Sequence, residues 1–324
     1  MKIPLFIVVR VWIFVLIIFC CHTRSSDASF SNVGVGPRAI GMGGAFTAVA
    51  DDAFAPFWNP AGLVQLGHAE LATMRLYYPV ENVNSDLVSL AWPIPKIPWS
   101  ATLATSYLGT GETDLYKEKV LLVSYGQDLY DWIKLPLAVG ISVKKLIVNY
   151  ENYDPMDPLF RISDRASGSS VSSGLILQYS PNLKLAFVFD NISSSNLSIN
   201  QEEESDQNSN SANIGRRFGL TWTSLSHSLL VSAEIAHEKF TQSVSVIQPR
   251  IGIEWWFWKW VAVRAGLNIP NISTKQAINL TGGFSCRPAV SEIIGMQLDY
   301  ALSYFDLDQS SLGNYHRVSL SFAF

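Results

Sequence analysis

The sequence has little charge. Only 15% of its 324 residues are Asp, Glu, Lys or Arg, and 48% are hydrophobic, whereas charged residues make up roughly 25% of an average soluble protein. The formal net charge at pH 7 is −4. This balance does not favour a nucleic-acid partner, which needs a basic surface.

Long hydrophobic runs are also missing from the body of the chain. The one such run extends from Val11 to Cys21, follows Lys2 and Arg10, and is shorter than the roughly 20 residues of a spanning helix. Polar and small residues follow it, so we predict a secretory signal peptide over residues 1–28, cleaved after Ala28. A retained N-terminal anchor is the alternative.

Cysteine is scarce as well. The chain has three cysteines, and Cys20 and Cys21 lie in the predicted signal peptide, which leaves Cys286 alone. We therefore expect no disulfide framework, no cysteine-based metal site and no cofactor. A lipid-modified Cys20 or Cys21 is a weaker alternative, because bulky Phe19 stands where such a site has a small residue.

What the chain does have is alternation, most clearly at its C-terminus. The last ten residues, YHRVSLSFAF, put His316, Val318, Leu320, Phe322 and Phe324 on one face and polar or small residues on the other. One oily face and one wet face with a period of two are expected of a strand in a transmembrane barrel. Phe322 and the final Phe324 also resemble the C-terminal signal that the barrel assembly machinery reads in bacterial outer-membrane proteins.

The same pattern recurs from about residue 69 onward in segments of roughly ten residues, separated by turn-forming residues. We predict fourteen strands, at 69–78, 85–94, 98–107, 117–127, 136–149, 166–180, 182–191, 214–224, 227–237, 247–257, 259–268, 276–287, 292–303 and 315–324. An even number fits a single-chain bacterial barrel with both ends in the periplasm. The predicted fold is therefore all-β: a transmembrane antiparallel β-barrel of about 14 strands, integral to the bacterial outer membrane.

The connections in the second half of the chain support this count. Outer-membrane barrels have short periplasmic turns and longer extracellular loops, and here the two kinds alternate. The short connections are 180–182, 225–227, 257–259 and 287–291, and the long ones are 150–165, 192–213, 238–246 and 303–314. Loop 192–213 is acidic and rich in Ser and Asn, so we expect it to be exposed; a cation site at 202–206 is a weaker interpretation.

Charged residues within the predicted strands should face the lumen, because a charge on the lipid face costs roughly 2–4 kcal/mol at the membrane midplane. Two roles are open for them: they coordinate a passing substrate, or they pair across the lumen and hold it shut, which we favour. We also expect an aromatic girdle at the membrane interface from Trp255, Trp256, Trp258 and Trp260. The predicted lumen-lining charges are Lys184, Asp190, Glu234, Arg250, Glu254, Arg264, Asp299 and Arg317.

The densest motif, GVGPRAIGMGGAFTAVADDAFAPFWNPAGL, spans residues 34–63, before the first predicted strand. It is too irregular for a strand. Its glycines permit close backbone approach, and residues 59–62 form a turn or a helix start. A nucleotide-binding loop is discounted, because no apolar strand precedes the motif, the third glycine is missing and no Lys-Ser/Thr follows.

These residues resemble the N-terminal motif of the FadL-like outer-membrane proteins, and more closely that of their PorV/PorQ branch. The resemblance continues at 261–268, 298–303 and 313–324, although the residues at 56–58 are bulkier than the family pattern. It implies that residues 29–68 form a periplasmic or plug (hatch) segment inside the lumen of a barrel built from 69–324. Carried over residue by residue, the plug motif comprises Arg38, Gly41, Met42, Gly43, Gly44, Asp51, Asp52, Asn59, Pro60, Ala61 and Gly62.

The resemblance implies two possible functions. The first is a channel for the uptake of hydrophobic small molecules, in which the ligand displaces the plug and no covalent step occurs. The alternative is a PorV/PorQ-like component of type IX secretion that binds exported proteins at the outer membrane. The expected partners are outer-membrane lipid, the barrel assembly machinery, and either a hydrophobic ligand or secreted proteins. We do not expect an enzyme, because His68, His227, His237 and His316 are scattered and form no visible pairing with Ser or Asp.

Overall fold

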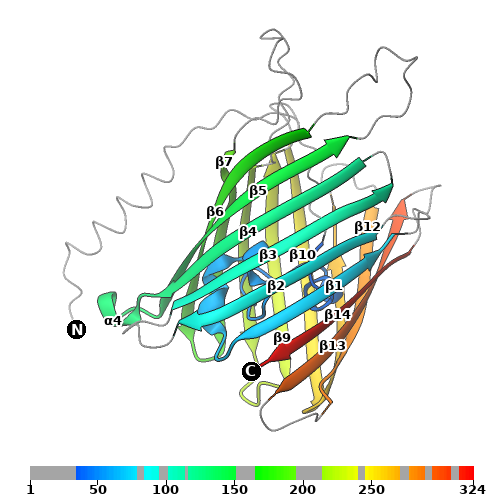
Figure 1. Ribbon diagram of the computed structural model, residues 1–324. Helices are drawn as coiled ribbons and strands as arrows, with labels where there is room; N and C mark the ends of the chain where they lie inside the picture. Colours follow the sequence, from blue (N-terminus) through cyan, green and yellow to red (C-terminus); the bar gives the residue numbers. More distant parts are fainter. Residues whose placement is uncertain are drawn as a thin grey trace, which may run out of the picture.

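The computed structural model describes residues 34–78, 84–94, 101–113, 116–150, 165–194, 214–239, 245–270, 277–288, 294–307 and 314–324. These residues form fourteen antiparallel strands in one closed barrel, in which each strand pairs with its sequence neighbours and β1 pairs with β14 (Figure 1). The fold class predicted from the sequence is therefore confirmed. The predicted signal peptide at 1–28 and the candidate cation site at 202–206 lie outside the described residues.

The strands are β1 Glu70–Tyr77, β2 Asn84–Ile94, β3 Ala101–Thr113, β4 Tyr116–Asp128, β5 Leu137–Tyr150, β6 Arg165–Ser180, β7 Leu183–Ser194, β8 Ile214–Thr223, β9 Leu229–Lys239, β10 Ser245–Trp258, β11 Val261–Asn268, β12 Ala277–Cys286, β13 Gly295–Leu307 and β14 Asn314–Ala323. The helical elements are α2 Pro37–Gly41, α3 Ala55–Trp58, the 3-10 helix η1 Pro60–Gln65, and α4 Tyr130–Ile133, which lies in the β4–β5 connection. Among the described residues, no helix is long and apolar enough to cross a bilayer.

Each predicted strand segment overlaps one observed strand, and the largest difference is at β3. The alternation predicts an end near residue 107, but β3 continues to Thr113 and stays paired with β4 through an irregularity between Thr110 and Thr113. Backbone pairing can continue beyond the lipid, where an outward residue need not be apolar. The hydrophobic pattern therefore ends before the strand does.

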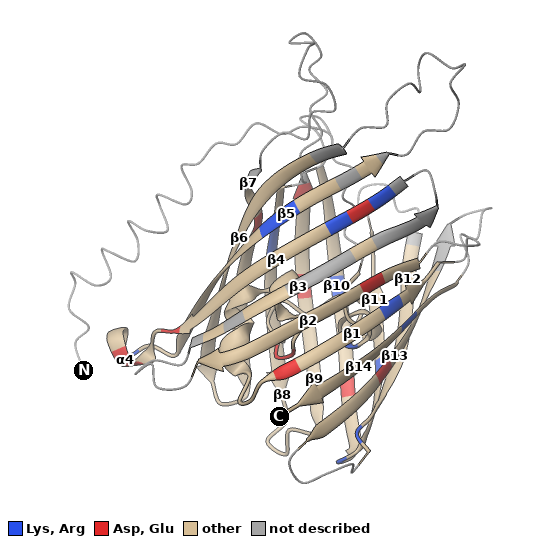
Figure 2. Ribbon diagram, viewed as in Figure 1, with Lys and Arg blue, Asp and Glu red and all other residues tan. Residues whose placement is uncertain are grey.

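The outer face of the barrel is apolar. On β10, Ile251, Ile253 and Trp255 are 50%, 44% and 51% exposed, whereas Gly252 and Glu254 between them are buried. Exposed large apolar side chains also occur on β1, β2, β4, β5, β8, β9, β11, β12 and β13, and most of the wall carries no charge (Figure 2). A closed barrel with this surface is an integral outer-membrane protein.

One ion pair is an exception, because it lies on the outer face. Arg75 of β1 and Asp86 of β2 are direct partners in register, with 2.6 Å between Arg75 Nη2 and Asp86 Oδ2, and both side chains are 47% exposed. Each charge neutralises the other. The paired residues can therefore face outward, although a single charge at either position would carry the free-energy cost of facing lipid.

Three of the four predicted girdle tryptophans lie on the outside near the β10–β11 turn. Trp255, Trp258 and Trp260 are about half exposed, and the rings of Trp258 and Trp260 stack with their centroids 5.0 Å apart. Trp256 differs: its Nε1 donates to Glu254 Oε1 at 3.1 Å, and Arg287 lies over its ring at 3.9 Å. Because Trp256 shares the inward face with Glu254, it belongs to the lumen side.

The chain before β1 fills part of the lumen. Residues 34–66, called the hatch below, contain α2, α3 and η1 and lie inside the ring of strands (Figure 1). Helix α2 packs against β11 to β14, and η1 packs against β3 to β6. The hatch therefore reaches both sides of the inner wall.

The local structure of the hatch follows from its prolines and from one cap. Pro37, Pro56 and Pro60 stand in the first turns of α2, α3 and η1, where a missing backbone N–H is not needed. The side chain of Asn59 caps η1 by accepting a hydrogen bond from Ala61 N at 3.0 Å. Such short helices have little stability of their own, so packing inside the barrel must hold them.

Candidate functional site

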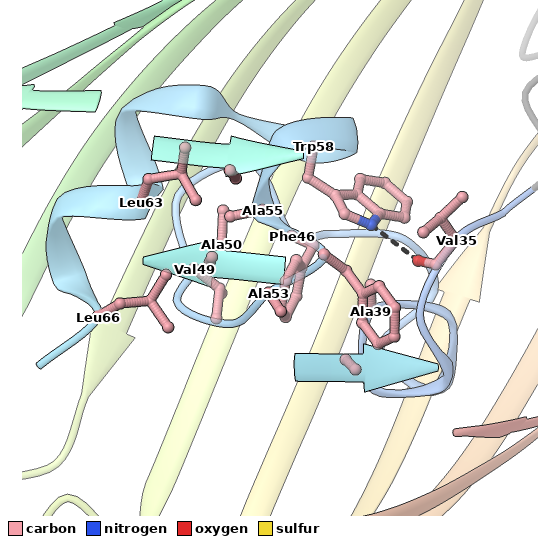
Figure 3. Close-up of a cluster of buried hydrophobic side chains, with 14 of the residues drawn as sticks. Val35, Ala39, Phe46, Val49, Ala50, Ala53, Ala55, Trp58, Leu63 and Leu66 are labelled. Atoms are coloured by element: carbon pink, nitrogen blue, oxygen red, sulfur yellow. Dashed lines mark hydrogen bonds between the residues drawn. The ribbon is translucent and has the colours of Figure 1, made fainter. Parts of the chain in front are cut away.

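The hatch has an apolar centre of its own. Phe46, Met42 and Leu63 are fully buried, and the ring of Trp58 meets that of Phe46 edge to face with centroids 6.0 Å apart. Trp58 Nε1 donates to the carbonyl oxygen of Val35 at 2.8 Å, which joins the end of α3 to the start of the hatch (Figure 3). The hatch is thus a compact unit rather than an extended thread.

The wall accommodates this unit with glycines that face inward. A Cβ at Gly140 of β5 would lie 2.2 Å from Ala61 N, and a Cβ at Gly266 of β11 would lie 2.0 Å from Gly43 N. No side chain fits at either distance. The turn at residues 59–61 and the turn at residues 42–43 therefore rest directly on the backbone of opposite parts of the wall.

An ion-pair network joins α2 to the wall. Arg38 donates from Nε to Glu254 Oε2 at 2.7 Å and from Nη2 to Oε1 at 2.9 Å. Arg264 of β11 also reaches Glu254 Oε2, at 2.6 Å, and Asp299 of β13 at 3.1 Å. Arg38 Nη1 pairs with Asp51 of the hatch itself. The Arg38 guanidinium thus joins the hatch to itself and to β10, and Arg264 extends the network to β11 and β13.

The pKa values of the hatch residues match this arrangement. Burial alone would lower the pKa of Arg38, but the carboxylates of Asp51 and Glu254 outweigh it and raise the pKa well above its ordinary value. Burial raises the pKa of the Asp52 carboxyl well above its usual range, although Arg38 opposes the shift. Asp52 Oδ2 lies 3.8 Å from Arg38 Nη1. Of the three carboxylates paired with Arg38, that of Asp52 is the most distant.

A second anchor holds the middle of the hatch. Glu234 Oε2 on β9 accepts hydrogen bonds from Phe46 N at 3.2 Å and Thr47 N at 2.9 Å. Its other oxygen accepts from Arg250 Nη1 at 2.9 Å. The carboxylate therefore accepts from two successive backbone donors of the hatch, of which Phe46 N also donates to Gly44 O at 2.9 Å.

The end of the hatch is anchored through amides. Asn59 Nδ2 donates to Thr47 O at 2.9 Å and to Leu175 O of β6 at 3.2 Å. Gln65 donates to Val49 O at 2.7 Å and accepts from Lys184 Nζ of β7. These contacts tie η1 both to the hatch core and to the wall.

The structure places the predicted plug motif within these contacts. All eleven motif residues lie in the hatch, and all are buried except the half-buried Asp51 and Asp52. The predicted lumen-lining charges lie on inward-facing positions. Six of them form ion pairs with described residues: Asp190, Glu234, Arg250, Glu254, Arg264 and Asp299. Lys184 and Arg317 form no ion pair with a described residue. Arg317 donates instead to Gly34 O and Ser303 Oγ, each at 3.0 Å.

The sequence analysis missed further lumen charges, and two of them pair with Asp190. Lys144 of β5 lies 3.0 Å from Asp190 Oδ1, and Arg217 of β8 pairs with Asp190 Oδ2 while its Nη2 donates to Phe57 O at 3.4 Å. Lys144 is followed by Lys145, and Arg217 is preceded by Arg216; in both pairs the neighbouring basic residue lies on the opposite face of the strand. Because adjacent residues of a strand point to opposite sides, a doubled charge does not reveal which member is inside.

The described residues contain no group of three or more His, Cys, Asp or Glu residues able to hold a metal ion. The fold and the site define a class: an outer-membrane β-barrel whose lumen contains an N-terminal hatch.

Comparisons with solved structures agree on the fold. The structure is similar to "CymD monoaromatic hydrocarbon channel" with a TM-score of 0.64, 16% identity, and coverage of 91% of this chain and 98% of that one. It is similar to the Ralstonia pickettii toluene transporter TbuX with a TM-score of 0.56, 14% identity, and coverage of 90% and 97%. A Pseudomonas aeruginosa FadL homologue gives a TM-score of 0.51, 11% identity, and coverage of 93% and 99%. The fold is therefore FadL-like.

Sequence comparison gives no such match: no protein-family model matches the chain, and a search of curated proteins finds no match. The likeness thus lies in the path of the backbone.

Proposed function

We propose that this protein is an outer-membrane channel for hydrophobic small molecules and that the hatch is its gate. The observation that carries the proposal is the hatch itself, an apolar unit seated on wall glycines and held by polar anchors inside a closed barrel. Two of the solved structures with this fold compared above are named as a monoaromatic hydrocarbon channel and a toluene transporter, which supports this substrate class.

The proposed transport consists of binding and release. A ligand reaches the extracellular side of the hatch, the hatch shifts, and the ligand passes on to the periplasm or the membrane. Several anchors hold the hatch, so movement of one part while others stay in place costs less than release of the whole segment. No covalent chemistry is needed, in accord with the expectation that the protein is not an enzyme.

A reversible crosslink tests the gate. A Cβ at position 219 of β8 would lie 3.3 Å from the Cβ of Ala48, close to the roughly 3.5–4.5 Å that a disulfide spans. We therefore suggest the double variant Ala48→Cys/Gly219→Cys in a Cys286→Ser background. The double variant is expressed in cells, and uptake of the fluorescent hydrophobic probe N-phenylnaphthylamine is measured. The lipopolysaccharide leaflet of these cells slows uptake of the probe in the absence of a channel.

The proposal predicts fast probe uptake by the reduced variant, slow uptake after oxidation, and recovery on reduction. Gly219→Cys alone, treated in the same way, controls for effects of the oxidant. Equal uptake in the oxidised and reduced states would show that this contact need not open. Absence of uptake by the intact protein would refute the channel.

The PorV/PorQ-like role in type IX secretion stays an alternative hypothesis from the sequence. The compared structures named above as a channel and a transporter give it no support. A pulldown from a host with that secretion system distinguishes the two roles: exported proteins with a shared C-terminal signal would favour the secretion role.

A further inference from the structure

Buried polar atoms without a hydrogen-bond partner gather in one part of the lumen. Within the described residues there are five such side-chain atoms. They are Thr47 Oγ1, Arg217 Nε, Arg250 Nε, Asn268 Oδ1 and Asn279 Oδ1. An unpaired buried polar group is costly, and a native structure has few of them. Their common location therefore needs an explanation.

The strand register shows how close the wall atoms are. Arg250 of β10 is the direct partner of Asn268 of β11, and Asn268 is the direct partner of Asn279 of β12. Direct partners in antiparallel strands have Cβ atoms about 4.5–5.5 Å apart. The row continues through Glu234 of β9 to Gly219 of β8. Three neighbouring strands thus present unpaired polar atoms side by side.

The hatch lies beside this row. A Cβ at Gly44 would be 3.5 Å from Arg250 Cδ and 3.7 Å from its Nε. Gly43 N donates to Thr281 Oγ1 at 2.9 Å, two residues along β12 from Asn279. Thr47, which carries another of the unpaired atoms, packs over Gly219 at the far end of the row. The polar row therefore borders the proposed gate.

The hydrogen-bonding capacity of the row is mixed. Arg250 Nε is a donor, and the two Asn Oδ1 atoms are acceptors. Arg250 is fixed by its ion pair with Glu234 and by Gln248, to whose Oε1 its Nη2 donates at 2.6 Å, so its Nε is not free to turn elsewhere. A hydroxyl group both donates and accepts and can pair with both kinds of atom. A hydrocarbon can pair with neither, and an ether can only accept.

We propose that Arg250, Asn268 and Asn279 form a polar subsite that binds the hydroxyl group of an otherwise hydrophobic ligand beside the hatch. This inference rests on the proposed channel function and makes it more specific. The ligand class is a hydrophobic alcohol or phenol. Its hydroxyl donates to an Asn Oδ1 and accepts from Arg250 Nε, while its apolar body stays in the lumen.

The test uses three probes of nearly equal size: para-ethylphenol, which donates and accepts, para-ethylanisole, which only accepts, and ethylbenzene, which does neither. Binding is measured by calorimetry on the full protein in lipid nanodiscs, with empty nanodiscs subtracted to remove partition into lipid. We expect the phenol to bind at least about tenfold more tightly than ethylbenzene. The ether should lie between the two, because it can accept from Arg250 Nε but leaves both amide oxygens unpaired.

The double variant Asn268→Leu/Asn279→Leu should lower the affinity for the phenol to that for the ether, because only the donor Arg250 Nε is left in the subsite. Gln178→Leu is the matched control, because Gln178 is an amide on β6 whose Nε2 donates to Ser180 O, away from the subsite. It should retain the preference. The single variants Asn268→Ala and Asn279→Ala repeat the test with smaller changes if the double variant fails to fold.

The outcomes are distinct. Equal affinity of the intact protein for all three probes would overturn the subsite and leave the channel standing. A preference for the phenol over the ether that persists in the double variant would also overturn the subsite. If no probe binds, both the subsite and the channel are refuted.

Discussion

Arg38 of the hatch and Glu254 of β10, 216 residues apart in sequence, are joined by two hydrogen bonds of 2.7 Å and 2.9 Å. The pair is buried, and Glu254 also accepts from Arg264 at 2.6 Å. The Glu254 carboxylate thus lies between two positively charged guanidinium groups and offsets the repulsion between them. The consequences of losing either partner should therefore differ.

Glu254→Gln should destabilise the barrel by about 3–5 kcal/mol, because it leaves two buried cations without their shared anion. Arg38→Met should cost less, roughly 1–3 kcal/mol, since Glu254 keeps Arg264. The measurement is urea unfolding in lipid vesicles. Asp131→Asn is the control, because Asp131 and Lys134 form an exposed pair in α4, worth no more than about 1 kcal/mol. Equal losses from the two core variants would contradict the shared-anion arrangement.

A second prediction concerns the contact between hatch and wall at Gly140. Gly140→Ala should push η1 away, because the new methyl group would lie 2.2 Å from the backbone of Pro60. We expect a loss of about 1–3 kcal/mol and faster cleavage of the hatch by added protease. Gly67→Ala is the matched control, since a Cβ there meets nothing within 4 Å. Protease resistance equal to that of the unchanged protein would show that the hatch does not rest on β5.

The outward ion pair on β1 and β2 gives a third prediction. Arg75→Leu or Asp86→Leu alone should destabilise the barrel, because each leaves one charge facing lipid. The cost falls from roughly 2–4 kcal/mol at the midplane to about 0–1 near the interface. The double variant should regain most of the loss. A double-mutant cycle by urea unfolding in vesicles measures the coupling; strictly additive losses would mean that the two residues do not protect each other.

The C-terminal aromatic gives a fourth prediction. Phe324 is half exposed, its backbone pairs with Ala69 through both N–H and C=O, and its ring meets Trp92 edge to face at 6.1 Å. Phe324→Ala keeps the backbone bonds, so its effect should fall on assembly: less folded barrel in the outer membrane, seen as less heat-modifiable protein on a gel. Phe257→Ala removes a similarly exposed aromatic away from the terminus and should assemble normally. Similar yields of folded barrel for both variants would show that Phe324 is not part of an assembly signal.

The wall of this protein could be predicted from the sequence because its cause is local. Each strand meets lipid on one side and the lumen on the other, so a two-residue period appears in the residues themselves, as at Ile251, Ile253 and Trp255. That period, together with the turn-forming residues between segments, predicts the strands, and the cost of a charge facing lipid predicts the inward position of Glu254. The pattern misleads where lipid no longer acts, at the C-terminal end of β3, and where charges are doubled, at Lys144 and Arg217. It also misleads where two charges pair on the outer face, at Arg75 and Asp86.

The contacts inside the lumen depend on tertiary structure. The residues of the hatch motif are visible in the sequence, but no local period tells that Arg38 meets Glu254 or that Gly43 rests on Gly266. Those contacts join residues more than 200 positions apart, and they exist only because the barrel closes with one register. The alignment of Arg250, Asn268 and Asn279 likewise depends on two strand pairings. Local sequence thus determined the barrel wall, whereas closure and register decided what its interior can hold.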